Sequence, residues 1–179
     1  HALVDARMPL AQPGPTLDDY RLHLELLYSW ADGLRTLPVG GIPLDAELDA
    51  LRADIDECLR LRGRAPDMAA RAHGDRPATA MRAGTDTPQG PFAWGIAYVP
   101  EGSRLGGQVL YRGLAASLAP HSLSYLRGAG AATGPRWKAF VAALDQHVAT
   151  PADVQAACDG AVLAFERLLK CHRASGRAP

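Results

Sequence analysis

The stretch YVPEGSRLGGQVL, residues 98–110, decides how this chain is interpreted, because three glycines stand inside a segment that otherwise has helical spacing. Glycine in a helix interior costs about 1 kcal/mol relative to alanine. Gly102 and Gly106 are four residues apart and therefore share one helical face, and Gly107 lies beside them. The stretch predicts a helix with one surface free of side chains.

Three explanations fit such a bare helical surface. The first is close packing against another helix, as in motifs that repeat small residues at every fourth position. The second is a phosphate-binding loop, which is disfavoured because GSRLGG lacks the lysine and hydroxyl of a Walker motif and no strand precedes it. The third is a flat ligand lying directly on the main chain, whose burial offsets the lost helix propensity. The residues alone leave the first and third explanations open.

Helical periodicity extends over most of the remaining sequence, and no strand-like alternation is found. Apolar residues at three- and four-residue spacing predict five helices, at 16–36, 44–62, 92–118, 136–148 and 151–168. Thr16 is the expected N-cap of the first helix, and Pro151 suits the first position of the last. Pro100 and the glycines are expected to kink or break the third helix. The sequence therefore predicts an all-α, multihelical single domain over residues 1–179.

Two finer expectations concern particular segments. Residues 66–91 contain several prolines and are expected to be irregular, with short helical turns at most. The last helix is expected to bury one apolar face, made by Val154, Cys158, Ala161, Phe165 and Leu168.

The composition argues against several classes of partner. The 179 residues are 47% hydrophobic, which is enough for one domain with a sizeable core. Their formal net charge is zero, so no global basic field exists to hold nucleic acid or an acidic membrane surface. The apolar stretches are too short to span a bilayer, and no leader pattern stands at the start. The three cysteines are widely spaced, as in proteins with reduced thiols. We therefore expect a cytoplasmic protein that binds neither nucleic acid nor membranes.

His1 is the histidine whose surroundings suit metal binding. Asp5 lies four residues later, so that its carboxylate reaches the imidazole of His1 across one helical turn. Such a pair has the form of a metal-bound imidazole that a neighbouring acid orients. The alternative is that His1 is a frayed surface residue, and the spacing alone leaves both open.

Four segments resemble the heme oxygenase family. The stretch at 98–110 resembles the family's distal-helix signature, in a form close to that of bacterial enzymes, including those associated with bacteriophytochromes. Residues 125–140, YLRGAGAATGPRWKAF, resemble the segment that leads into the next helix, and residues 150–168 resemble the closing helix. At the other end, HALVDARMPL resembles the proximal segment, in which an acid follows the axial histidine by four residues.

The resemblance implies a heme-oxygenase fold in which heme is held between a proximal helix and a kinked distal helix. His1 would be the proximal iron ligand, and Asp5 would fix its orientation. Gly102, Gly106 and Gly107 would let the distal backbone close over the porphyrin and leave room for molecular oxygen.

The resemblance also assigns roles to four polar residues. Lys138 and Tyr98 would be partners of the heme propionates. Ser103 stands where the animal enzymes carry an aspartate just after the first distal glycine. Because a serine cannot carry that charge, proton delivery would depend on water held by Ser103 or on another group such as Arg104.

The activity implied by the resemblance is the oxidative opening of heme to biliverdin, carbon monoxide and iron. Heme is both substrate and cofactor in this reaction, and oxygen is the co-substrate. Electrons must come from an external donor, either a ferredoxin or a reductase, and a bacteriophytochrome is an expected acceptor of biliverdin. Ser103 in place of the acid leaves an alternative open, a non-catalytic module of the same fold that binds heme or a bilin.

Overall fold

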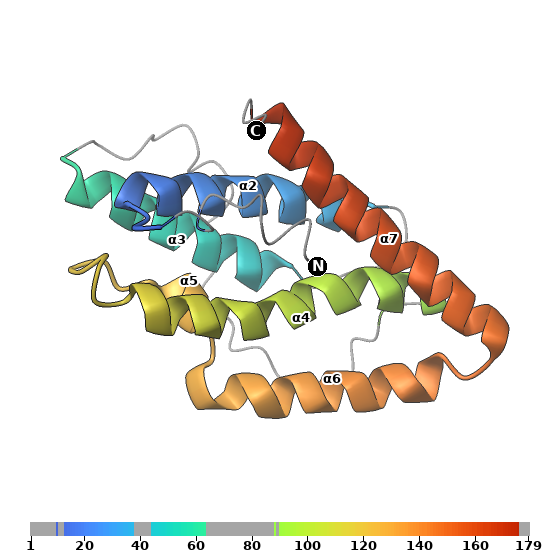
Figure 1. Cartoon of the computed structure of the whole chain (residues 1–179). Helices are drawn as coiled ribbons and strands as arrows, with labels where there is room; N and C mark the ends of the chain where they lie inside the picture. The colour runs from blue at the N-terminus through green and yellow to red at the C-terminus, as the bar shows by residue number, and fades with distance from the viewer. Residues whose placement is uncertain (1–9, 11–12, 38–43, 64–87, 89, 176–179) are drawn as a thin grey trace.

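The computed structural model describes residues 10, 13–37, 44–63, 88 and 90–175 (Figure 1). Its elements are α2 (Leu17–Arg35), α3 (Asp45–Leu61), α4 (Pro91–Leu114), α5 (Ser124–Arg127), the 3-10 helix η3 (Gly130–Ala132), α6 (Thr133–His147) and α7 (Pro151–Ala174). The described residues contain no strand, so the predicted all-α class is confirmed. The expectation of an irregular segment at 66–91 falls almost wholly outside them.

Capping residues explain where the first and last of these helices begin. The Thr16 hydroxyl accepts a hydrogen bond from the Asp19 amide at 3.3 Å, and the Asp19 carboxylate accepts from the Thr16 amide at 2.9 Å. Thr150 and Asp153 repeat this reciprocal pair at the start of α7, at 3.2 and 3.0 Å. Each pair satisfies amides that have no partner within the helix.

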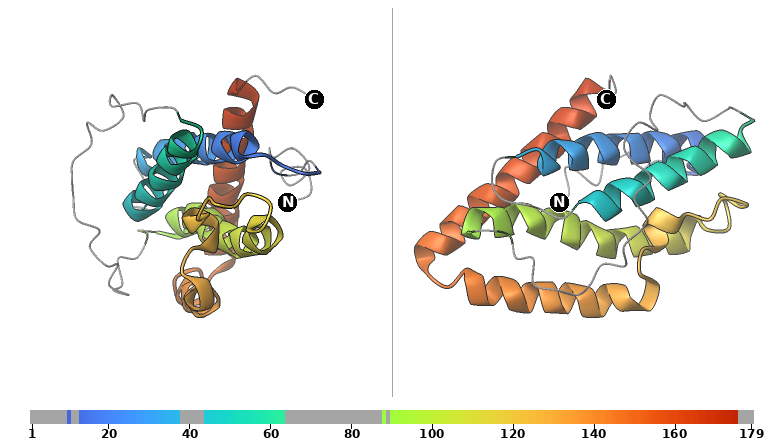
Figure 2. Two further views of the ribbon diagram at one scale, coloured as in Figure 1. Left: turned by 90° about the vertical axis from the view of Figure 1, so that its left-hand side faces the viewer. Right: turned by 180° about the vertical axis from the view of Figure 1, so that it is seen from behind.

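Helices α2, α3, α4 and α7 enclose the core, and α6 lies along α4 on the side away from α2 and α3 (Figures 1 and 2). The apolar stripe predicted for α2 faces this core. Among its members, Tyr20, Leu24, Leu27, Ala31 and Leu34 are all buried. The Trp30 indole donates a hydrogen bond to the Ala164 carbonyl of α7 at 2.8 Å, which ties α2 to α7. None of the described helices combines the length and apolarity that a membrane span requires.

The glycine-containing helix was expected to be kinked or broken, and it is not broken. Helix α4 is one continuous helix from Pro91 to Leu114, with Pro100 inside it (Figure 1). A proline there lacks the amide that would bond the preceding turn. Pro100 is fully buried, so packing against the core offsets the missing hydrogen bond.

The closest helix crossing joins α4 to α7 through two other glycines. A Cβ added to Gly95 would lie 2.8 Å from the Cα of Ala157 and closer still to its carbonyl oxygen. A Cβ added to Gly160 would lie 3.0 Å from the carbonyl carbon of Phe92 and closer to the oxygen. Only glycine fits at such contacts between backbones. The close packing of helices through small residues therefore occurs at Gly95 and Gly160.

This crossing corrects the face that α7 was expected to bury. Leu168 is buried as predicted, but Val154 is 50% exposed and Cys158 is also exposed. The buried residues of α7 include Gly160 and Ala164 in their place. Because the small residues are drawn against α4, the helix is rotated and its larger apolar side chains at the N-terminal end face solvent.

Candidate functional site

The predicted bare surface lies on the C-terminal half of α4, and the structure divides its three glycines. A Cβ added to Gly106 would meet no described atom within 4 Å, whereas one on Gly102 would lie 3.6 Å from the ring of Trp137 in α6. A Cβ on Gly107 would lie 3.4 Å from the carbonyl oxygen of Leu126 in α5. Gly106 is therefore the open position, Gly102 is flanked by an aromatic ring, and Gly107 faces another element.

Apolar and aromatic side chains border this open surface. Tyr98 is 36% exposed, and its ring centre lies 5.2 Å from that of Trp137. Val109 is 66% exposed, one turn beyond Gly106 on the same helix. Phe140 stacks on Trp137 with ring centres 5.8 Å apart. We call Tyr98, Gly102, Gly106, Val109 and Trp137 the glycine face; its apolar rim suits an apolar ligand.

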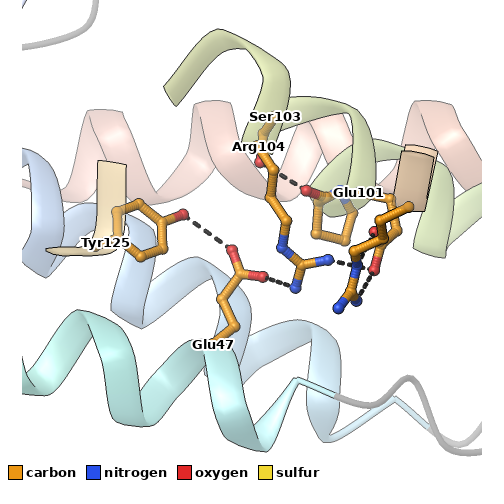
Figure 3. Close-up of polar contacts among 7 residues, drawn as sticks. Glu47, Glu101, Ser103, Arg104 and Tyr125 are labelled. Carbon is orange, nitrogen blue, oxygen red and sulfur yellow. Dashed lines mark hydrogen bonds and ion pairs between the residues drawn. The ribbon is translucent and has the colours of Figure 1, made fainter. Parts of the chain in front are cut away.

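Ser103 is exposed on the same half of α4. Its hydroxyl donates a hydrogen bond to the Pro100 carbonyl at 2.8 Å (Figure 3). The oxygen keeps lone pairs that accept hydrogen bonds from water. Ser103 can thus hold a water molecule beside the helix, although its own proton is engaged with the main chain.

Arg104 points away from the glycine face into a chain of partly buried ion pairs. It bridges Glu47 of α3 and Glu101 of α4 (Figure 3). Arg136 of α6 continues the chain, because its Nη2 lies 2.6 Å from one Glu101 oxygen and its Nε lies 3.0 Å from the other. The Tyr125 hydroxyl of α5 donates to Glu47 at 2.9 Å. We call Glu47, Arg104, Glu101 and Arg136 the ion-pair chain; it links three helices.

The charges in this chain support one another. Burial works to raise the pKa of Glu101, but Arg136 and Arg104 lower that pKa below its usual value. Burial likewise works to lower the pKa of Arg104, but Glu47 and Glu101 raise it above the usual value. Since an arginine does not lose its proton in proteins, Arg104 can orient water through its N–H groups but cannot relay a proton by itself.

A second buried polar cluster fixes α5, the element that Gly107 faces. One oxygen of Asp54 accepts hydrogen bonds from the Tyr20 hydroxyl at 2.6 Å and from the Tyr125 amide at 2.9 Å. The Asp54 carbonyl lies 3.0 Å from Nε2 of His121, whose Nδ1 accepts from the Leu123 amide at 2.9 Å. Nε2 therefore carries the proton and donates to that carbonyl. This cluster ties α5 to α2 and α3, and α5 in turn lies against α4 at Gly107.

The other predicted site residues are distributed unevenly. Tyr98 lies at the glycine face, while Lys138 is exposed on α6. His1 and Asp5 lie outside the described residues. Within the described ranges, no three His, Cys, Asp or Glu side chains come together in a way that could hold a metal ion.

Sequence reasoning missed the ion-pair chain. The spacing of Glu101 and Arg104, three residues apart on one helix, is a weak signal for an ion pair. The sequence around Glu47 gave no signal for an ion pair, because an acid in the first turn of a helix is usually solvated and interacts favourably with the helix dipole. Arg136 was adjacent to a tryptophan of the motif, but its partner is 35 residues away.

Comparison with known proteins adds no further assignment: no family model matches the chain, and no curated protein matches it. The likeness to heme oxygenases therefore depends on the four quoted segments.

Proposed function

We propose that this chain is a heme oxygenase that opens heme to biliverdin with release of carbon monoxide and iron. The observation that carries the proposal is the open main chain at Gly106, on a helix whose sequence resembles the distal-helix signature of heme oxygenases. A flat ring needs such a surface, because any side chain at that position would hold it away from the helix.

The described residues fit an apolar ring of this kind. The missing Cβ of Gly106 leaves space that a side chain would fill, and Tyr98 and Trp137 offer apolar contact beside it. His1 would supply the imidazole for the iron, oriented by Asp5, as the resemblance implies. Lys138 remains a candidate for a propionate because it is exposed on the neighbouring helix.

Each residue then has a limited task. Heme supplies the iron chemistry when it is bound, and the chain binds it, orients it and controls access of water. The backbone at Gly102 and Gly106 leaves room for molecular oxygen. The Ser103 oxygen accepts a hydrogen bond from a water, which can deliver protons where no carboxylate stands. Electrons come from an external ferredoxin or reductase, and a bacteriophytochrome is a candidate acceptor of biliverdin in the cytoplasm of a bacterium.

One observation favours a second candidate function, non-catalytic binding of heme or a bilin. The Ser103 hydroxyl is already engaged with the Pro100 carbonyl, so its proton is not directed at the open surface. A module of this kind would hold the tetrapyrrole without turnover.

Hemin titration followed by reduction separates these functions. The full-length protein is mixed with hemin, the Soret band is recorded, and a ferredoxin with its reductase is added under air. A heme oxygenase gives a Soret band at one equivalent and then the spectrum of biliverdin, whereas a binding module keeps a stable heme spectrum. Absence of any saturable Soret change would overturn both.

Two variants test the axial ligand. His1→Ala should change the Soret maximum and weaken hemin binding, because it removes the proposed imidazole. Arg173→Ala is the control, since Arg173 is exposed in the last turn of α7, away from the glycine face. Identical spectra for His1→Ala and the unmodified protein would contradict the assignment of His1.

A further inference from the structure

Helix α6 is attached to the rest of the protein mainly along one side. Thr133, in the first turn, is the one residue of α6 that is buried. Rings supply part of the remaining attachment to α4: the ring centre of Trp94 in α4 lies 5.4 Å from that of Phe140 and 5.0 Å from that of His147. A helix held in this way depends on a few contacts for its exact position.

Charged and apolar contacts between α4 and α6 stand next to each other. Glu101 and Gly102 are neighbours on α4, and Arg136 and Trp137 are neighbours on α6. Arg136 binds Glu101 through two N–H groups, at 2.6 and 3.0 Å, while the Trp137 ring lies against Gly102. Two parallel hydrogen bonds fix the orientation of a guanidinium as well as its distance. The pair therefore sets the angle at which the adjacent ring meets the helix.

The carboxylate of this pair cannot easily move with α6. Glu101 also binds Arg104, which binds Glu47, whose side chain is 2% exposed. Glu47 in turn accepts the hydrogen bond of the partly buried Tyr125 (Figure 3). The ion-pair chain thus anchors its outer member, Arg136, to the interior of the protein.

We infer that Glu101 and Arg136 are positioning residues, which hold Trp137 against Gly102 as one wall of the glycine face. Trp137 is the residue that would touch a flat ligand there, and the ion pair acts through it. The role of this wall in ligand binding rests on the proposed function. The effect of the ion pair on α6 does not.

Hydrogen exchange of the ligand-free protein tests the positioning itself. In Arg136→Gln, amides of α6 should exchange about fivefold faster or more, while those of α2, α3 and α7 keep their rates. Arg136→Lys keeps the charge but not the two parallel hydrogen bonds. Its α6 amides should exchange at rates between those of Arg136→Gln and those of the unmodified protein. Arg35→Gln is the matched control, because it breaks the exposed pair with Asp32 on α2 and should leave α6 unchanged. Equal α6 exchange in Arg136→Gln and the unmodified protein would overturn the inference.

A double-mutant cycle on hemin binding tests the route through Trp137. Arg136→Gln and Trp137→Leu should each raise the hemin dissociation constant roughly tenfold, and the double variant should bind no more weakly than Trp137→Leu alone. If the double variant raised the dissociation constant by the product of the two single increases, Arg136 would act independently of Trp137, which contradicts the inference. If the unmodified protein binds no hemin, the proposed function fails, and the exchange experiment still decides whether the ion pair positions α6.

Discussion

Gly95 of α4 and Ala157 of α7 meet backbone to backbone, so closely that a Cβ on Gly95 would lie 2.8 Å from the Ala157 Cα. This contact marks the place where the two helices cross near the N-terminal end of α4 (Figure 1). Because the helices cross, α7 covers that end and diverges from the other. The half of α4 that holds Gly102 and Gly106 is consequently left uncovered by α7.

Replacing Gly95 by alanine should therefore separate α4 from α7. We expect Gly95→Ala to lower the free energy of unfolding by about 3 kcal/mol or more, because backbone atoms cannot yield as a flexible side chain would. Gly113→Ala is the matched control on the same helix: its Cβ would meet nothing within 4 Å, so stability should rise by up to about 1 kcal/mol. Urea denaturation measures both, and similar shifts for the two variants would contradict the close crossing.

Local signals in the sequence predicted where most helices lie. Thr16 as an N-cap, Pro151 at a first helical position and the periodic leucines are signals that depend on residues within one or two turns, so the predicted starts of α2 and α7 agree with the structure. The helix expected to be kinked or broken near Pro100 is continuous, because burial of the proline compensates for a lost hydrogen bond and burial is a tertiary property.

The sequence could not show which face of a helix meets which neighbour. Glycine spacing predicted a bare surface on α4, but Gly95 and Gly160, which make the closest contact, are 65 residues apart in the chain. The pairing of Glu47 with Arg104 depends on the same long-range packing. Only the assembled fold brings such partners together.

A side chain at Gly106 should affect ligand binding without harming the fold. Its Cβ position is open, so Gly106→Leu should keep or slightly raise the stability of the ligand-free protein. The same change should weaken hemin binding at least about tenfold, or about 1.4 kcal/mol, because leucine would occupy the place of the ring. Gly113→Leu, two turns further along α4, should leave affinity nearly unchanged. Equal affinities for the two leucine variants would count against the glycine face.

The three cysteines should differ in reactivity toward alkylating agents. Burial, followed by the carboxylate of Asp54, raises the pKa of the Cys58 thiol to about 12, and the side chain is buried. Burial also raises the pKa of Cys171, which is partly covered, whereas Cys158 is exposed. Because the thiolate is the reactive form, native protein at pH 8 should be labelled first at Cys158 and not at Cys58. Peptide mass spectrometry checks the order, and early labelling of Cys58 would show that α3 opens readily.

Stability should fall in mild acid because of one buried histidine. Burial lowers the pKa of His23 to about 4, and its Nδ1 has no hydrogen-bond partner among the described residues. The unfolded chain has a histidine pKa near 6.5, so the unfolded state binds the proton first as the pH falls. The stabilising contribution, about 3 kcal/mol, is complete above pH 6.5 and is lost between pH 6.5 and 4. His23→Leu should flatten the pH dependence of the melting temperature across this window. An unchanged slope would show that other groups cause the acid sensitivity.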